Sequence, residues 1–320
     1  RANEVVEIFS EFPELIDPHT GRHLMERTTI ICNTSNMPVA AREASVYTAM
    51  TICEYYRAMG LKCLLLADST SRWAQALREM SNRMEELPGA DAFPVDLSAI
   101  ISNFYARAGM VVLNNGKTGA VTFIGTVPPA GGNLKEPVTE STKKAARCFY
   151  GLEQNRADQK RYPAVNPIES YSKYLEYPEI ISWLDEHVEH GWVANVTKAK
   201  NLLRRGREAN EQINILGDDG VPVAYHVSFW KSELIDFVFL QQDAFDETDA
   251  LCPMDRQKYM LDLVLDICGI DFDFEDFEKC REFFKELIND LRQMNYTKFH
   301  SEEFENYAEK IHKLIEDYGK

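Results

Sequence analysis

Two short apolar runs, each followed by a helical pattern, dominate the first part of the chain. Thr28–Cys32 is apolar and β-branched, and Leu61–Ala67 is almost continuously apolar, so both are predicted to be buried strands. Apolar residues at helical spacing follow over Val39–Met59 and again over Arg72–Met84. Apolar strands that alternate with helices predict an α/β fold with a parallel sheet covered by helices on both faces.

A β-hairpin is predicted next, after a helix over Leu97–Ala108. Val111–Leu113 and Ala120–Thr126 are apolar runs joined by a turn that contains Asn115-Gly116, a strong hairpin signal. The turn also holds Gly116-Lys117-Thr118, the last three residues of a phosphate-binding P-loop. The complete motif needs Gly at position 111, where this chain has Val, and a helix directly afterwards, where a strand is predicted. We interpret the segment as a hairpin, and the sequence contains no complete P-loop.

The pattern changes in the second half of the chain. A long Pro/Gly-rich loop, Val127–Pro137, of the kind that is often functional, precedes a helix near Val138–Tyr150. From about Ser170 amphipathic helices dominate, over residues 170–190, 192–214, 228–242, 255–268, 275–294 and 301–318. Gly217–His226 is an exception, which we expect to be a turn with a short extended piece, and Val221–Trp230 is expected to form a hairpin in the helical domain. We expect the α/β domain over residues 1–185 and an all-α helical bundle over residues 186–320.

The charge balance limits the kinds of partner. The 320 residues include 35 basic and 51 acidic side chains, a formal net charge of −16. This argues against nucleic acid or anionic lipid as the main partner. Part of the acid excess lies in Asp271–Glu278, which we expect to be a solvated or partner-facing tail.

The cysteines and the start of the chain indicate the cellular compartment and whether the chain is part of a longer protein. The seven cysteines are scattered and include no CxxC pair, so we expect buried, reduced thiols in a cytosolic protein instead of disulfides or a zinc site. No apolar run approaches the ~20 residues that span a bilayer, and no signal peptide is visible. Patterned sequence begins at once from Arg1, so we expect an excised fragment of a longer protein.

Asp68, at the end of the Leu61–Ala67 run, is the first candidate for chemistry. Small hydroxyl residues and then Arg72 follow it. A buried strand that delivers one Asp at its carboxyl end is how P-loop ATPases hold Mg²⁺ beside a triphosphate. The alternative is that Asp68 caps the next helix, and the local sequence supports both interpretations equally.

Four further residues are weaker candidates. Arg1 and Glu4 place a cation and a carboxylate at the start of the chain, where ends are usually solvated. Tyr162, stiffened by Pro163, and Phe245, after a helix, could present rings to a flat ligand, although packing in the core is the default for both. The histidines show no metal-ligand spacing.

Longer motifs combine these signals. They occur in order along the chain and read NTSNMPVAAREAS (33–45), ADSTSRWA (67–74), PPAGG (128–132), YPAVN (162–166), LQQDAF (240–245) and LCP (251–253). They resemble the catalytic A subunit, or alpha chain, of V-type and archaeal-type rotary ATPases, and the resemblance covers nearly the whole chain. It implies part of a RecA-like P-loop NTPase sheet, followed by an all-α C-terminal bundle.

The resemblance also implies roles for the candidate residues. Arg1 would follow the family's catalytic glutamate and contact the γ-phosphate of ATP, and Glu4 would lie in the outer shell around magnesium. Asp68 would hold Mg²⁺ through a coordinated water, with Arg72 shaping the phosphate end of the site. Tyr162 and Phe245 would flank adenine, and stacking of this kind contributes ~1–3 kcal/mol per base in nucleic-acid complexes.

The sequence departs from the family in what it lacks. The family's N-terminal barrel, its bulge insertion, its GxxxxGKT loop and the catalytic glutamate are absent from these residues. The loop supplies most of the phosphate contacts, so triphosphate affinity should collapse without it.

The family implies a subunit of a rotary motor that hydrolyses or synthesises ATP and couples this to H⁺ or Na⁺ transport. Three such subunits would alternate with three B subunits around a central stalk, with a peripheral stalk beside them, as a cytoplasmic head on the membrane with no segment inserted. For this chain alone, a structural or interaction module without ATP chemistry is the expected state. A related hexameric export ATPase is the third possibility, which the large acidic C-terminal domain disfavours.

Overall fold

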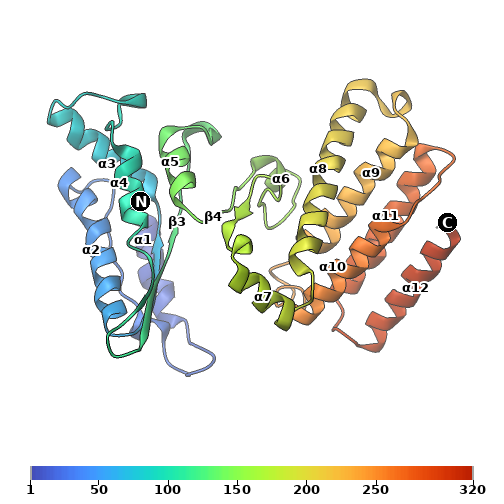
Figure 1. Cartoon of the computed structure of the whole chain (residues 1–320), viewed down its shortest axis with the longest axis horizontal. Coiled ribbons are helices and arrows are strands. Elements are labelled where there is room, and N and C mark those ends of the chain that lie inside the picture. Colours follow the sequence, from blue (N-terminus) through green and yellow to red (C-terminus); the bar gives the residue numbers. More distant parts are fainter. Residues whose placement is uncertain (1, 319–320) are drawn as a thin grey trace. The chain divides into compact units, whose positions relative to one another are not determined.

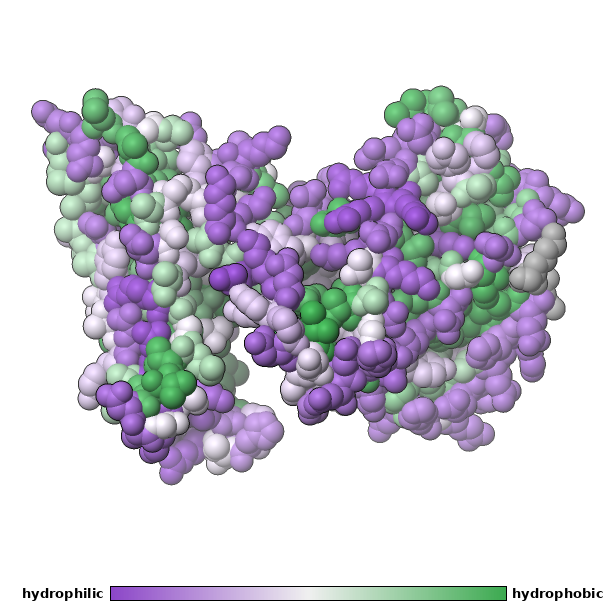
Figure 2. Space-filling view, viewed as in Figure 1, coloured by the Kyte–Doolittle hydropathy of each residue, from purple (hydrophilic) through white to green (hydrophobic). Residues whose placement is uncertain are grey.

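A computed structural model describes residues 2–318 of the chain (Figure 1). The chain divides into two compact units, Arg1–Ala146 (unit 1) and Arg147–Lys320 (unit 2). Figure 2 shows that hydrophilic residues cover much of the visible surface and that hydrophobic residues break through locally.

Unit 1 is a small sheet with helices. Its helices are α1 (Ala2–Glu11), α2 (Val39–Ala58), α3 (Thr70–Arg83), α4 (Leu97–Tyr105) and α5 (Pro137–Ala145). Its strands are β1 (Lys62–Ala67), β2 (Gly109–Val112) and β3 (Thr118–Gly125). Short 3₁₀ turns lie at Phe12–Glu14, Leu24–Arg27, Ala90–Ala92 and Ala130–Gly132.

The sheet has the order β1-β3-β2. β1 pairs with β3 in parallel, from Lys62 opposite Ala120 to Ala67 opposite Gly125, and β2 pairs with β3 in antiparallel. Gly116 adopts a positive φ of 78° in the connecting turn, as an Asn-Gly hairpin turn requires. The predicted hairpin is therefore confirmed, and Gly116-Lys117-Thr118 is not part of a P-loop. The sheet has a parallel pair as predicted, but the parallel partner of Leu61–Ala67 is the second strand of the hairpin and not Thr28–Cys32.

Helices cover one face of this sheet. Side chains from α2, α3 and α4 meet the inner face of β3 in a core whose members include Met50, Trp73, Ile101, Phe104 and Val121 (Figure 1). On the other face, the side chains of Leu64, Leu66 and Ile124 are 60%, 66% and 52% exposed. The expectation that both faces are covered is thus wrong for the described residues, because apolar alternation commits a strand to burial only where a second layer packs on it.

Thr28–Cys32 does not form the predicted strand. Thr28 has extended backbone dihedrals (φ −122°, ψ 134°), yet residues 28–32 join no ladder in the described part of the chain. They remain partly or largely exposed, and Ile31 is 39% exposed. The prediction fails because β-propensity expresses the fit to a pleated neighbour, and none pairs with this segment here.

Unit 2 is a helical bundle preceded by an irregular segment with two short strands, β4 (Cys148–Phe149) and β5 (Tyr171–Ser172). The helices are α6 (Gln154–Asp158), α7 (Pro178–His187), α8 (Trp192–Leu216), α9 (Val223–Leu234), α10 (Met254–Gly269), α11 (Phe277–Asn295) and α12 (Glu302–Tyr318). Short 3₁₀ turns lie at Lys173–Glu176 and Asp218–Gly220, and a π-helix, Ile235–Leu240, continues α9. The bundle confirms the all-α prediction, although the helices expected over 170–190 and 138–150 are shorter than predicted.

The compact units divide earlier in the chain than residue 185, the expected domain boundary. Residues between these points pack into unit 2: Ile168 contacts the main core of the bundle and Leu184 a smaller core beside α8. Lys200 Nζ donates a hydrogen bond to Ser170 O (2.8 Å). The boundary at residue 185 stays a prediction about sequence domains, which need not coincide with compact units.

The expected hairpin over Val221–Trp230 is helical instead. Pro222 occupies the N-cap position of α9, and the helix runs through the whole of the remaining segment. His226 is buried, its Nε2 lies 3.0 Å from Asp218 O, and its ring stacks on Phe277. The β-branched and aromatic residues that suggested a strand are used for tertiary packing, which overrides local propensity.

Asp271–Glu278 is not a solvated tail. Phe274 is 8% exposed, and it packs with Phe272 against Phe283 and Phe284 of α11. Asp276 caps α11 by accepting a hydrogen bond from Lys279 N (2.8 Å). Aromatic and acidic residues alternate here because the rings enter the core while the carboxylates stay in water.

A close approach of α8 and α9 gives a test of the bundle. A Cβ on Gly206 would lie 2.0 Å from Ser232 Cβ. We expect Gly206→Ala to lower the free energy of unfolding by about 1–3 kcal/mol, because overpacking outweighs the gain in helix propensity. Ser232→Gly should restore most of the loss in the double variant. Urea unfolding followed by circular dichroism checks this, and a Gly206→Ala chain as stable as the parent would contradict the packing.

Candidate nucleotide-binding site

Asp68 lies where β1 ends, beside the end of its parallel neighbour β3. The register that pairs Ala67 with Gly125 brings Asp68 next to Thr126. Thr126 Oγ1 lies 3.0 Å from Asp68 Oδ1, to which it donates, and Thr126 N donates to Ala67 O (3.0 Å). The carboxylate is thereby oriented at the carboxyl edge of the sheet, where open α/β sheets bind their ligands.

The geometry separates the two interpretations of Asp68. Ser69 is the N-cap residue of α3, and no side-chain cap hydrogen bond forms at this helix end. Instead, Thr70 N donates to Thr126 O (2.9 Å), which ties the first turn of α3 to the end of β3. Asp68 is exposed and does not cap α3, so its carboxylate is available to a cation.

One carboxylate is too few for an all-protein metal site. The part of the chain that the structure describes contains no cluster of three or more His, Cys, Asp or Glu side chains suited to a metal ion. Mg²⁺ is commonly held by one or two carboxylates, with water and substrate phosphates as the remaining ligands. Asp68 fits that arrangement and does not fit a closed metal site.

The glycine that precedes Thr126 is required by its surroundings. A Cβ on Gly125 would lie 2.8 Å from the Tyr105 hydroxyl oxygen and 3.1 Å from Thr70 Cγ2. Burial raises the pKa of Tyr105 to about 12. The hydroxyl group therefore stays protonated and fills the space under the strand ends.

The other candidates from the N-terminal part lie on separate elements. Arg72 is in the first turn of α3, exposed, with Nη1 donating to Gln75 Oε1 (3.2 Å). It lies on the same β1–α3 connection as Asp68. Glu4 is exposed in the first turn of α1, and Arg1 lies outside the described residues.

Tyr162 and Phe245 belong to unit 2, and both rings face solvent. Tyr162 is 52% exposed and Phe245 is 99% exposed. Packing in the core, the default for both aromatics, is therefore wrong. Fully exposed phenylalanine loses apolar burial unless a ligand or partner covers it, so these rings are available for stacking.

Backbone contacts join the two loops that carry these rings. Gln242 N donates to Tyr162 O (2.8 Å), three residues before Phe245. Gln242 Nε2 donates to Asp249 O (2.6 Å), and Phe245 N donates to Asp243 Oδ1 (2.9 Å). Burial raises the pKa of Asp249, whose Oδ2 accepts from Asp243 N (2.6 Å). The loop is thus tied at both ends while its aromatic tip remains exposed.

A buried ionic network lies directly behind Tyr162. Asp236, in the π-helix, accepts from Arg156 through both carboxylate oxygens (2.9 and 2.6 Å) and from Arg161 Nη1 (2.6 Å). Arg161 also pairs with Glu233 (2.9 and 3.0 Å), and its guanidinium lies 4.5 Å from the Phe237 ring centroid. These contacts hold the segment before Tyr162 on α9 and its π-helical extension.

Sequence reasoning missed these supporting residues. Thr126 was recognisable in principle, because the carboxyl ends of parallel strands meet at one edge of a sheet. Asp236 and Arg161 gave no such signal, since they lie 75 positions apart and each resembles a surface charge on its own segment.

Comparison with known proteins now defines the class. The sequence model of the ATP synthase alpha/beta family, nucleotide-binding domain, matches residues 1–172, and that of the C-terminal domain of V and A type ATP synthase matches residues 181–269. The chain therefore belongs to the ATP synthase alpha/beta family.

Within this family it is similar to V-type ATP synthase alpha chains. It is 51% identical to that of Borrelia hermsii over 98% of this chain and 52% of the relative. It is 48% identical to that of Protochlamydia amoebophila over 100% of this chain and 54% of the relative. The chain thus spans about half the length of the curated relatives it matches. The expected resemblance to the alpha chain of V-type ATPases is confirmed.

A solved structure supports the fold. The ATP synthase subunit NeqB from Nanoarcheaum equitans superposes with a TM-score of 0.61 at 19% identity, covering 75% of this chain and 56% of that one. At this identity the likeness bears on the fold alone.

Proposed function

We propose that this chain is part of the catalytic alpha (A) subunit of a V-type rotary ATPase or ATP synthase. The observation that carries the proposal is the exposed carboxylate of Asp68, oriented by Thr126 at the carboxyl edge of the β1–β3 pair and free of any helix-capping role. Identity of about half over the whole chain to V-type ATP synthase alpha chains supports it.

The reaction class is phosphoryl transfer between ATP and water. In this proposal Asp68 would hold Mg²⁺ through a water molecule, Arg72 would shape the phosphate end of the site, and Arg1 would contact the γ-phosphate. Mg²⁺, when bound, neutralises charge on the phosphate oxygens. Glu4 would lie in the outer shell around the ion, while Tyr162 and Phe245 would stack on adenine of ATP or ADP. Most of the work of these residues is positioning and charge compensation, as is general for this chemistry.

The proposed partners are B subunits in an alternating ring, with central and peripheral stalk subunits and coupling to H⁺ or Na⁺ transport. None of the described helices is both long and apolar enough to serve as a membrane span. We propose a peripheral location on the membrane as part of the ATPase head.

For the 320 residues alone we propose a folded but inactive module. The sequence contains no complete P-loop, and that loop makes most phosphate contacts in its class. An export-type hexameric ATPase is not favoured, because the match to the C-terminal domain of V and A type ATP synthase covers residues 181–269.

Calorimetric titration with Mg-ATP tests both parts of the proposal. The chain alone should show no micromolar binding. A chimera that joins the preceding part of the Borrelia hermsii alpha chain to this chain should bind Mg-ATP, and omission of Mg²⁺ should weaken the binding. Micromolar binding by the chain alone would contradict the inactive module, and a folded chimera without affinity would contradict the nucleotide role.

The exposed rings give a sharper prediction in the chimera. Phe245→Ala should weaken Mg-ATP binding about 5- to 150-fold, the equivalent of about 1–3 kcal/mol of lost stacking. Its free energy of unfolding should change by less than about 0.5 kcal/mol, because the ring buries little surface. Leu251→Ala is the matched control, since Leu251 is 80% exposed in the following turn. Equal losses of affinity in both variants would exclude specific stacking by Phe245.

A further inference from the structure

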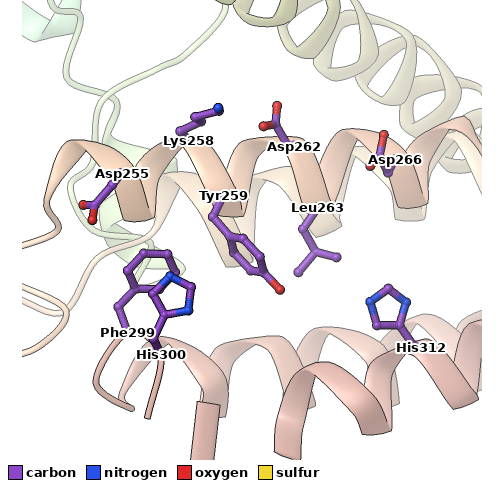
Figure 3. A pocket seen from close by; sticks show the side chains of 9 residues that line it. All are labelled: Asp255, Lys258, Tyr259, Asp262, Leu263, Asp266, Phe299, His300 and His312. Carbon is purple, nitrogen blue, oxygen red and sulfur yellow. The ribbon is translucent and has the colours of Figure 1, made fainter. Parts of the chain in front are cut away.

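A groove runs between α10 and α12 in unit 2, and none of the residues that line it is assigned to the nucleotide. Both helices contribute to one core, and side chains from α10, from α12 and from the segment before α12 line a cavity of about 520 Å³. Tyr259 and Leu263 point from α10 toward α12, and Phe299 comes from the segment before α12 (Figure 3). The groove has an apolar floor along one side of α10.

The floor is built from rings that hold one another. The Tyr259 ring packs edge-on against Phe299 (5.6 Å between centroids) and is tilted against Phe304 (5.5 Å), which is fully buried. Rings fixed in this way lose little conformational entropy when a partner covers them. Such rings are frequent at the energetic centre of interfaces.

The rim of the groove is acidic. Asp262 and Asp266 are one helical turn apart on α10, in the row adjacent to Tyr259 and Leu263 (Figure 3). Asp255 also lines the groove, whose lining thus holds three carboxylates and one ammonium group, that of Lys258, together with the imidazoles of His300 and His312. Lys258 Nζ lies 3.9 Å from Glu189, outside the groove, and this pairing reduces the compensation further.

The carboxylates of this rim are not fully neutralised by nearby positive charges. Burial raises the pKa of Asp262, and the negative charges of Glu189 and Asp266 add to the shift, while Lys258 opposes it. Asp262 Oδ1 accepts a hydrogen bond from Asn195 (3.3 Å). Asp266 is exposed and forms no hydrogen bond or ion pair with the residues that the structure describes. Cations brought to this row would relieve carboxylate repulsion.

The groove's dimensions fit a helix. Asp255 and Asp266 are eleven residues apart on α10, a rise of about 16 Å, or three turns of an apposed helix. An amphipathic helix in a hydrophobic groove uses apolar anchors at i, i+3, i+4 and i+7, and its flanking positions then face the rim. The acidic row requires Lys or Arg at those positions.

We propose that the α10–α12 groove is a docking site for a basic amphipathic helix of a partner protein, with apolar anchors on Tyr259, Leu263 and Phe299 and cationic flanks on Asp262 and Asp266. This interaction is separate from the proposed nucleotide site, so either can fail without the other.

The test uses the 320-residue chain and a fluorescein-labelled synthetic helical peptide of about 18 residues, or five turns, with Leu on one face and Lys on the other. Fluorescence anisotropy should show saturable binding. Asp262→Asn with Asp266→Asn should weaken it about five- to tenfold, and Tyr259→Ala at least about tenfold. Leu263→Ala, at a half-buried position, provides a second apolar variant should Tyr259→Ala lower the melting temperature.

The matched control removes two carboxylates with the same spacing elsewhere. Glu278 and Glu282 are exposed, lie four residues apart on α11 and do not line the groove, so their conversion to Gln should change affinity by less than about twofold. Equal weakening by both double variants would reduce the binding to general attraction by an acidic protein and overturn the proposal. So would equal affinity for a peptide with Glu in place of Lys. If the chain self-associates and Tyr259→Ala abolishes this self-association, the groove binds a second copy of the chain, and the proposal of a partner helix is overturned.

Discussion

Replacing Asp68 with Asn is expected to lower Mg-ATP hydrolysis by at least about a hundredfold in the chimeric subunit assembled with its partner subunits. Removing one well-placed electrostatic group at a reacting phosphate or oxyanion typically costs about 10²–10³ in rate. The folded structure should be unaffected, because Asp68 is exposed and Asn keeps an oxygen that accepts from Thr126 Oγ1. The melting temperature should therefore stay within about 1–2 °C of the parent.

Two further variants separate orientation from charge. Thr126→Val removes the hydroxyl group that donates to Asp68 and should lower hydrolysis by only about three- to tenfold, since the charge remains. Asp96→Asn is the control: Asp96 is exposed in the same unit, and its side chain makes no cap hydrogen bond at α4. Hydrolysis by Asp68→Asn within threefold of the parent would contradict the metal role. A large loss of stability would point to a structural role instead.

The second large effect concerns stability of unit 2. Asp236→Ala should lower its free energy of unfolding by about 3–5 kcal/mol, because it leaves two largely buried guanidinium groups without their shared carboxylate. The Asp236 side chain is 7% exposed, and those of Arg156 and Arg161 are 11% and 17% exposed. Burial opposes the charge on Arg161, yet the hydrogen bonds and charges of Glu233 and Asp236 raise its pKa overall. The positive and negative charges of the network therefore balance one another. The loss of any one member leaves a buried charge without its partner.

The matched control is the exposed pair of Arg207 and Glu169, which lie 3.9 Å apart with side chains 53% and 55% exposed. Glu169→Ala should change the free energy of unfolding by less than about 1 kcal/mol. Urea unfolding followed by far-ultraviolet circular dichroism, with the m-value compared, measures both. If Asp236→Ala unfolds within 1 kcal/mol of the parent, the network does not hold the Tyr162 segment, and the position of that ring needs another explanation.

Local signals predicted a large part of this fold. The apolar run Leu61–Ala67 was predicted to be a strand. The observed strand β1 begins one residue later and ends at the predicted residue. Asn115-Gly116 between two apolar runs specified the hairpin, because few residues other than Gly and Asn tolerate the required dihedrals. The long helices of unit 2 were visible because their apolar period extends over several turns. Val221–Trp230 was misread, since a short segment rich in Val, Tyr and Phe carries no reliable period.

In the candidate site, too, some residues could be predicted from local sequence and others could not. Asp68 was recognisable because a strand end is a local feature with a known direction. Exposure of Tyr162 and Phe245 was not, because an aromatic residue in a loop can turn inward or outward at similar local cost. Only the contacts of Gln242 with Tyr162 and of Asp236 with Arg161 show which way the segment is held.

The amino-acid sequence by itself determined the Leu61–Ala67 strand, the hairpin, most of the long helices and the family, since a sustained period and long motifs at fixed spacing carry that information. The tertiary structure decided what depends on distant residues. It showed that one sheet face is uncovered, that Asp68 is held by Thr126 and does not cap α3, and that two arginines share one buried aspartate. Local sequence encodes the dihedral preferences and hydrophobic period of a segment. Burial, ion pairing and side-chain orientation are set by neighbours that the folded chain alone brings together.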